Sequence, residues 1–320
     1  MATARPIVSV ITANYNGARH LAAAARSVLD QTLTDLELIV VDDASTDDSL
    51  RVLAAEVAGD PRVRVLRHRR NKGPAAARNR ALAQARGCWI AVFDSDDLMA
   101  PDRLEALVGR AEAEWADVVV DNLIVFSDES EDPWKLFLNG AAWSQPRNIG
   151  LEDYIASSRL YSSRPGPGYL KPLICARTLA RTGIRYRETL RVGEDYDLIV
   201  RLLAQGAKLH LEPRPLYRYR THGGAFPEMM RREDVEALLA ADHDFERAYP
   251  HQPAGVRQAL QARRRSLQAA LAYDGVMTRL KAHDVGGGIR SGLREPAIWP
   301  LLALPVRARL RQLAARLHPA

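Results

Sequence analysis

The chain has 320 residues, of which 47% are hydrophobic and 26% are charged, with a formal net charge of +6 and two cysteines. This is the composition of an ordinary globular protein with one large or two small domains, and it excludes a disulfide-stapled scaffold. Residues 1–6 lead directly into an apolar run, and the uncharged stretch 297–306 is too short to span a bilayer. We therefore expect a cytoplasmic protein without a signal peptide.

Strand and helix patterns alternate along the first half of the chain. Short apolar runs predict strands at 7–11, 36–41, 63–66, 89–93 and 117–126. Apolar residues at helical spacing, a capping box at Ser45 and Asp48, and Pro74 in a first turn predict the helices between the first four strands. This order predicts an α/β fold with a mainly parallel sheet covered on both faces by helices.

Polar clusters follow three of the predicted strands. They are Asn14-Tyr15, Asp42-Asp43 and Asp94-Ser95-Asp96-Asp97. Ligands of such sheets bind beyond the carboxyl ends of the strands, so we expect these clusters to converge on one site. The three carboxylates of the last cluster would repel one another unless a cation binds, and hard divalent cations prefer carboxylate oxygens. The alternative is a turn whose Asp residues cap a helix starting at Pro101.

The second half begins less regularly. Residues 179–184 predict a short helix that ends at Gly183. Gly193-Glu194-Asp195 opens a further helix, where simple capping by carboxylates is the plainer interpretation. Two strands are predicted on either side of Glu212-Pro213, and they lead to His222, which precedes a Gly-Gly turn.

The C-terminal third is predicted to be helical. Residues 234–249 and 256–280 form long runs rich in Ala, Leu and Arg. Beyond Pro305, apolar residues line one face of a short basic helix. This helix either packs on its own domain or contacts an anionic membrane surface, and both interpretations stay open.

Six segments in the same order and spacing resemble family 2 glycosyltransferases of the GT-A fold. They are 8–16, 40–47, 71–73 with 77–79, 93–97, 193–198 and 219–222. Any one of these motifs is weak, but the whole set is specific. The resemblance implies a GT-A catalytic domain over residues 1–225, with a nucleotide-binding sheet. Residues 226–320 form a helical C-terminal extension, for which membrane or acceptor association is one interpretation.

The resemblance also implies roles for individual residues. Asp195 corresponds to the catalytic base, and Glu194 would assist it or orient the acceptor. Asp96 and His222 would hold a Mg²⁺ or Mn²⁺ ion beside the diphosphate. The nucleotide-binding positions are Ala13, Tyr15, Asp43, Arg78, Asp94 and Ser95. Ala13 departs from the family pattern, because many members carry Pro or Thr there.

The implied reaction is the inverting, metal-dependent transfer of a single sugar from a nucleotide-diphosphate sugar to an acceptor hydroxyl. The chain lacks the Gln-x-x-Arg-Trp motif of processive synthases, which favours the addition of one sugar at each encounter. The expected acceptor is a glycan or lipid-linked glycan of exopolysaccharide, lipopolysaccharide or another envelope polymer. The basic C-terminal helix would then allow peripheral contact at the inner face of the plasma membrane.

Other functions fit the sequence less well. A dehydrogenase would need G-x-G-x-x-G after the first strand, and a nucleotidyltransferase would need a glycine-rich basic loop there; Asn14-Tyr15-Asn16-Gly17 is neither. The net charge of +6 motivates a nucleic-acid-binding protein, but no binding motif accompanies it, so no nucleic-acid partner is expected. An inactive scaffold of related fold is the other alternative.

Overall fold

The computed structural model describes residues 5–128, 134–160, 166–221, 230–287, 290, 298–299 and 301. The chain divides into two compact units. The first comprises Met1–Ser157 with Arg164–Phe226, and the second comprises Ser158–Ser163 with Pro227–Ala320. His222 and the predicted basic helix beyond Pro305 lie outside the described residues.

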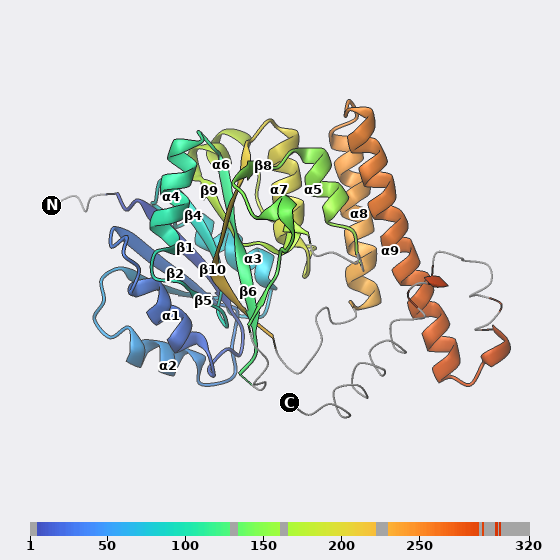
Figure 1. Cartoon of the computed structure of the whole chain (residues 1–320). Coiled ribbons are helices and arrows are strands. Elements are labelled where there is room, and N and C mark those ends of the chain that lie inside the picture. Colours follow the sequence, from blue (N-terminus) through green and yellow to red (C-terminus); the bar gives the residue numbers. More distant parts are fainter. Residues whose placement is uncertain are drawn as a thin grey trace, which may run out of the picture. The chain divides into compact units, whose positions relative to one another are not determined.

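The first unit is built on one mixed sheet with helices on both faces (Figure 1). Its main path has the strand order β3-β2-β1-β4-β9-β6-β10-β5. The first four strands of this path are β3 (Val63–Arg67), β2 (Leu36–Asp42), β1 (Val8–Asn14) and β4 (Trp89–Asp94), and they pair in parallel. Every residue of β2 is buried, which explains its nearly continuous run of Leu, Ile and Val. The predicted α/β class and flanking helices are confirmed.

The order of the parallel strands creates a switch point between β1 and β4. The chain moves outward from β1 to β2 and β3 through α1 (Leu21–Leu29) and α2 (Ser49–Glu56), then returns to the other side of β1 through α3 (Pro74–Leu82). Right-handed crossovers place α3 on the face opposite α1 and α2. Ligands of open α/β sheets bind at such a reversal, beyond the carboxyl ends of the strands.

The other half of the sheet contains antiparallel pairs. β9 (Pro172–Cys175) lies between β4 and β6 (Val118–Phe126) and runs antiparallel to both. β5 (Leu98–Met99) and β8 (Arg147–Asn148) pair with β10, and β7 (Lys135–Leu136) pairs with β6. α4 (Arg103–Ala113) packs on β6 and β10, and α6 (Ala176–Thr182) packs against β9.

The two strands predicted around Glu212-Pro213 are a single strand, β10 (Leu209–Arg220). It pairs in parallel with β6 along its whole length, with register shifts between Glu212 and Tyr217. Pro213 and Pro215 have no N–H to donate, so they interrupt the ladder without ending it. The predicted short helix ends as expected, because Gly183 follows α6 in the left-handed region.

The remaining helices of the first unit lie near the start of α7 (Glu194–Ala204). α5 (Leu151–Ser157), which the sequence patterns did not predict, packs against α7, and the ring of Tyr154 stacks on that of Tyr196 at 5.6 Å. Two 3₁₀ turns, η1 (Ala141–Trp143) and η2 (Pro167–Tyr169), complete this region, and η2 contacts both α5 and α7.

The second unit is a helical hairpin in its described part. α8 (Arg232–Ala248) and α9 (Ala254–Lys281) lie side by side (Figure 1), close to the helices that the sequence predicts. Arg263 of α9 and Asp242 of α8 are both buried and pair at 3.2 Å, and Arg263 also donates to the carbonyl of Ser158. No helix among the described residues is long and apolar enough to cross a membrane.

Gly87 marks a close approach of main chains where β4 begins. Its N–H donates to Ser9 Oγ at 2.8 Å, and that hydroxyl donates to the buried Glu37 at 2.6 Å. A Cβ at position 87 would lie 2.4 Å from the backbone nitrogen of Ser9 and 2.8 Å from the carbonyl oxygen of Trp89. Glycine at position 87 therefore allows the backbone before β4 to approach the backbone of β1, because any side chain there would overlap with Ser9 and Trp89.

Gly87→Ala should reduce the free energy of unfolding by about 1–3 kcal/mol, because the backbone of β1 must move to accept the methyl group. Gly109→Ala is the matched control. Position 109 lies inside α4 with nothing within 4 Å of an added Cβ, so this change should stabilise the protein by about 0.5–1 kcal/mol. Urea unfolding measures both variants, and equal effects of the two changes would contradict the packing described here.

Candidate active site

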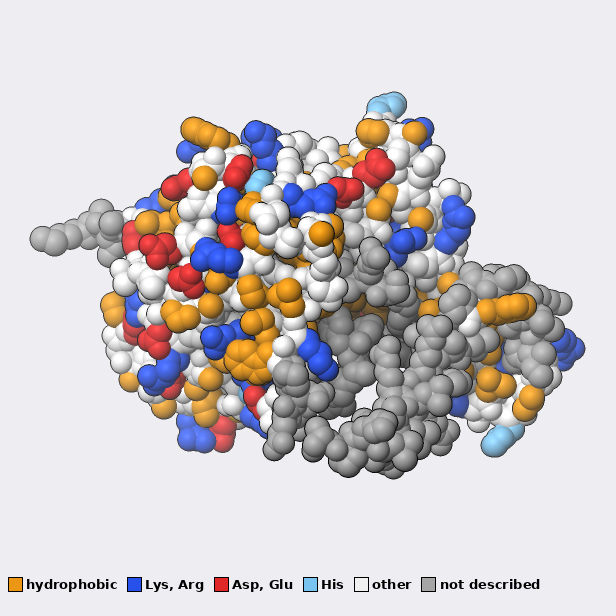
Figure 2. Space-filling view, in the orientation of Figure 1, with side chains coloured by type: hydrophobic (Ala, Val, Ile, Leu, Met, Phe, Trp, Pro, Cys, Tyr) orange, Lys and Arg blue, Asp and Glu red, His pale blue; other side chains and the backbone are white. Residues whose placement is uncertain are grey.

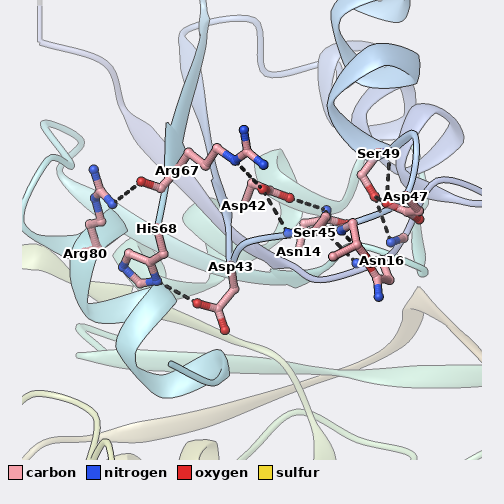
Figure 3. A network of polar contacts seen from close by, with 12 residues as sticks. Asn14, Asn16, Asp42, Asp43, Ser45, Asp47, Ser49, Arg67, His68 and Arg80 are labelled. Atoms are coloured by element: carbon pink, nitrogen blue, oxygen red, sulfur yellow. Dashed lines mark hydrogen bonds and ion pairs between the residues drawn. The ribbon is translucent and has the colours of Figure 1, made fainter. Parts of the chain in front are cut away.

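The carboxyl ends of β1 and β2 are joined by a network of polar side chains (Figure 3). The buried Asn14 donates from Nδ2 to Asp42 Oδ1 at 3.1 Å and to Ser45 Oγ at 3.2 Å. Ser45 Oγ also accepts from the backbone N–H of Asn16 at 2.9 Å. Ser45 thus ties the two loops together and does not cap α2 as the predicted capping box required. Asp47 accepts from the N–H of Ser49 at 3.0 Å instead.

Asp43 organises the loop that leads into α3. Its carboxylate accepts the backbone N–H groups of Lys72 at 2.9 Å and Gly73 at 2.7 Å. His68 Nδ1 lies 2.7 Å from Oδ1 of the same carboxylate (Figure 3). Gly73 has a φ of 89°, in a region that favours glycine, and Pro74 follows it in the first turn of α3. The Lys72 N–H also lies 3.0 Å from Oδ2, so each oxygen of Asp43 has two contacts and the carboxylate holds the loop firmly.

A buried cluster of charges lies next to this network. Arg78 of α3 is 3% exposed and donates from NH2 to Asp94 Oδ1 at 2.6 Å and from NH1 to Glu194 at the start of α7. The same NH1 lies 3.7 Å from Asp195. Arg78 Nε is buried and has no hydrogen-bond partner among the described residues. One guanidinium therefore links the end of β4 to the first turn of α7.

Lys171 and Tyr186 complete the cluster. Lys171 Nζ lies 2.8 Å from Asp94 Oδ2 and 2.9 Å from Asp195 Oδ2, and the Tyr186 hydroxyl donates to Asp195 Oδ1 at 2.9 Å. The Asp94 side chain is 24% exposed, against 11% or less for Arg78, Lys171 and the two carboxylates of α7. Asp94 is therefore the carboxylate of this cluster that a ligand reaches most easily.

The charges of the cluster determine which carboxyl groups are ionised. Burial opposes ionisation of Asp94 and Asp195, but the positive charges of Lys171 and Arg78 outweigh it and hold the pKa of each below its usual range. Burial raises the pKa of Glu194, and Arg78 opposes that rise only in part. Asp195 therefore remains a carboxylate at neutral pH, although it is buried.

The turn after β4 holds two further carboxylates. Asp97 is buried, lies 2.6 Å from the Tyr217 hydroxyl and accepts the backbone N–H of Arg220 at 2.7 Å. Arg220 Nε donates to the carbonyl of Asp96 at 2.6 Å, which ties β10 to the turn. Burial, followed by the charges of Asp96 and Asp94, raises the pKa of Asp97 well above its usual range. Asp97 therefore holds the turn to β10 and does not cap α4.

A divalent cation fits the chemistry of this turn. Among the described residues, no group of three or more His, Cys, Asp or Glu side chains could hold a metal unaided. The turn does place the carboxyl groups of Asp94 and Asp96 two residues apart, with Asp94 already paired with Arg78 and Lys171. Mg²⁺ commonly binds through one or two carboxylates and takes its other oxygens from substrate phosphates and water. Asp96 supplies one carboxyl group of the kind required, and His222 lies outside the described residues.

The structure gathers most of the predicted site residues at one edge of the sheet. In the strand register, Ala13 is half-buried between Val41 of β2 and Asp94 of β4. Tyr15, just beyond β1, is 52% exposed. Ser95 lies in the turn that follows β4. These residues meet at the switch point between β1 and β4, where an α/β sheet binds its ligand.

Three residues of the site were not predicted from sequence patterns. Lys171 precedes β9, a short strand that no pattern had indicated, and Tyr186 lies in the loop before α7. His68 follows β3 beside two arginines, and no motif singled it out. Lysine is almost never buried unless it is paired, but the burial of Lys171 is visible only in the structure, so the sequence offered no usable signal for it.

Comparison with known proteins identifies the family of the chain. Residues 9–165 match the family model described as glycosyl transferase family 2. The succinoglycan biosynthesis protein ExoO of Rhizobium meliloti (strain 1021) is 37% identical over 316 residues, which is 98% of this chain and 89% of that protein. ExoU of the same organism, also described as a succinoglycan biosynthesis protein, is 37% identical over 73% of this chain and 68% of its own length.

Solved structures share the fold. S. aureus TarS 1–349 in complex with UDP-GlcNAc has a TM-score of 0.62 at 19% identity, over 79% of this chain and 70% of that one. The mannosyltransferase PcManGT from Pyrobaculum calidifontis, in complex with GDP-Man and Mn²⁺, has a TM-score of 0.59 at 18% identity, over 92% of this chain and 83% of that one. The chain belongs to glycosyl transferase family 2 and is a glycosyltransferase.

Proposed function

We propose that the protein transfers a single sugar from a nucleotide-diphosphate sugar to an acceptor hydroxyl, with inversion at the anomeric carbon and with a divalent cation. The observation that carries the proposal is the buried cluster of Arg78, Asp94 and Asp195 at the switch point of the sheet. An ionised carboxylate thus lies beside the expected donor site. The unpartnered Nε of Arg78 and the exposed part of Asp94 are groups that a donor could satisfy.

Asp195 would act as the base. Its carboxylate takes the proton of the acceptor hydroxyl while that oxygen forms a bond to the anomeric carbon. The bond from this carbon to the phosphate oxygen breaks at the same time, and the nucleoside diphosphate leaves with the electron pair. Attack opposite the leaving group inverts the anomeric configuration, so an α-linked donor gives a β-linked product.

The base and ribose of the donor would lie at the ends of β1 and β2. Tyr15 is exposed beside this site and would flank the base. Asp43, whose carboxylate accepts hydrogen bonds from the loop before α3, would also receive a hydrogen bond from the base. Asp94 would reach the ribose, and Ser95 and Ala13 would lie beside the nucleotide.

A Mg²⁺ or Mn²⁺ ion held by Asp96 would neutralise the charge that develops on the diphosphate. His222 is the second proposed ligand. The proposal is supported by the oxygen donors that the turn after β4 supplies, since Mg²⁺ and Mn²⁺ prefer oxygen ligands. In this proposal each residue has a separate role. Asp96 binds the cation, Arg78 and Asp94 bind the donor, and Asp195 removes the proton from the acceptor hydroxyl.

The proposed acceptor is a glycan or lipid-linked glycan of an exopolysaccharide or another envelope polymer. This proposal follows the relatives whose names place them in succinoglycan biosynthesis. The alternative of a nucleic-acid-binding protein has less support. Lys and Arg are interspersed with Asp and Glu over the described residues of the face shown in Figure 2, whereas nucleic-acid-binding proteins gather basic residues into a patch.

Asp195→Asn should reduce transfer by about 10²–10⁴-fold, because an amide cannot accept the acceptor proton. Donor affinity should stay nearly unchanged. Transfer is measured as release of nucleoside diphosphate, and affinity is measured by calorimetric titration of the same donor. Asp35→Asn, at the exposed amino end of β2, is the matched control and should behave like the wild type. Equal losses of transfer and affinity would remove Asp195 as the base.

A screen of nucleotide sugars with Mn²⁺ or EDTA tests the reaction class. We expect one donor to be hydrolysed in the presence of Mn²⁺ and EDTA to abolish the reaction. Asp96→Asn should lower the rate on the order of 10²-fold and raise the Mn²⁺ concentration needed for half-maximal rate, since the cation contributes several kcal/mol in the transition state. Full activity of the wild type in EDTA would contradict metal dependence.

A further inference from the structure

The main chain at Lys171 is anchored by a buried ion pair. Arg103 of α4 and Asp121 of β6 are fully buried, and Arg103 NH2 lies 2.8 Å from Asp121 Oδ1. The same NH2 donates to the carbonyl of Lys171 at 2.8 Å. The next residue, Pro172, pairs with Val120 of β6. The Lys171 side chain therefore starts from a fixed point inside the sheet.

The ammonium of Lys171 forms one of two bridges between β4 and α7. Lys171 joins Asp94 Oδ2 to Asp195 Oδ2, while Arg78 joins Asp94 Oδ1 to Glu194. The lysine side chain is only 11% exposed. A buried ammonium is retained when it is paired, and here both partners are residues of the proposed reaction.

The bridge determines how Asp195 is oriented. Tyr186 donates to Oδ1 and Lys171 to Oδ2, so both oxygens of the carboxylate are held and its plane is fixed. A carboxylate with two such donors keeps lone pairs for the acceptor proton. A general base must lie within hydrogen-bond reach of the proton that it removes, and rotation of this side chain would move it out of reach.

We propose that Lys171 is a positioning residue of the transfer reaction, which orients the carboxylate of Asp195 and ties it to Asp94 on the donor side. The inference rests on the proposed role of Asp195 as the base. Lys171 itself does not touch the reacting atoms. It acts through Asp195, and a simple structural role would give a different experimental result.

The charge of Lys171 also affects the ionisation of Asp195. The titratable or charged groups that surround this carboxylate come from several elements: Arg78, Asp94, Lys171, Tyr186 and Glu194. Burial disfavours the carboxylate form, and the positive charges of Arg78 and Lys171 hold its pKa below the usual range. Removal of one positive charge should raise that pKa, so the base form would be lost at a higher pH than in the wild type.

The test compares Lys171→Met and Lys171→Arg with the wild type across the pH range in which the protein stays folded. The probe is the sugar nucleotide selected by the donor screen, with water as the acceptor, and the readout is release of nucleoside diphosphate. Lys171→Met should lower kcat by tenfold or more. On the acid side of the pH profile, which we call the acidic limb, the pH at which kcat/KM falls to half should rise by about one pH unit or more. Lys171→Arg keeps the positive charge, so its acidic limb should lie at the wild-type pH and its kcat should lie between those of Lys171→Met and the wild type.

The controls separate this inference from the proposed function. Lys208→Met, at an exposed lysine outside the cluster, should leave both the limb and kcat unchanged. If Asp195→Asn is inactive and folded Lys171→Met keeps the wild-type limb and kcat, positioning by Lys171 is wrong while the base assignment stands. If Asp195→Asn retains full activity, the base assignment fails and the inference fails with it. If Lys171→Met does not fold, the test rests on Lys171→Arg. An acidic limb at the wild-type pH together with a reduced kcat supports positioning by Lys171, and loss of the acidic limb refutes it.

Discussion

The burial of opposite charges in one place is the constraint on which the rest of this structure depends. Arg78 and Lys171 sit among Asp94, Glu194 and Asp195, and removal of one partner would leave an uncompensated buried charge at a cost of about 3–5 kcal/mol. A hydrophobic cluster of the same volume would be as stable or more so. Because the cluster lies at the switch point of the sheet, we interpret its charges as a requirement of the reaction rather than of stability.

The members of the cluster come from different parts of the fold. α3 supplies Arg78, β4 supplies Asp94, and α7 supplies its two carboxylates from the first turn. The antiparallel strand β9 is needed because its insertion between β4 and β6 brings Lys171 to the same place. The hydrogen bond from Arg103 to the Lys171 carbonyl fixes that segment to α4. Packing of helices on both faces of the sheet thus places Arg78, Asp94, Lys171 and Asp195 in contact with one another.

Local patterns predicted the parallel half of the sheet well and the contacts of the site poorly. The strands β1, β2 and β4 carry buried apolar runs, whereas β3 at the edge of the sheet is only partly buried. The convergence of the polar strand ends followed from sheet topology alone. Glu194 and Asp195 had a plain capping interpretation, and only the partnership with Arg78, more than a hundred residues earlier, shows why they are buried. Lys171 and Tyr186 carried no usable signal, because their partners are distant in sequence. The break predicted at Glu212-Pro213 was wrong, since pairing with β6 overrides the missing donors of Pro213 and Pro215.

The central claim is that a nucleoside diphosphate and a divalent cation bind together at the carboxyl ends of β1, β2 and β4. The most direct test is thermal unfolding of the whole chain. It is measured with UDP or GDP, each with and without Mn²⁺, and separately with duplex DNA as the alternative ligand. The account predicts that one nucleotide raises the unfolding temperature strongly with Mn²⁺ and weakly without it, because a ligand that binds only the folded state stabilises that state. Stabilisation by DNA and by neither nucleotide would contradict it.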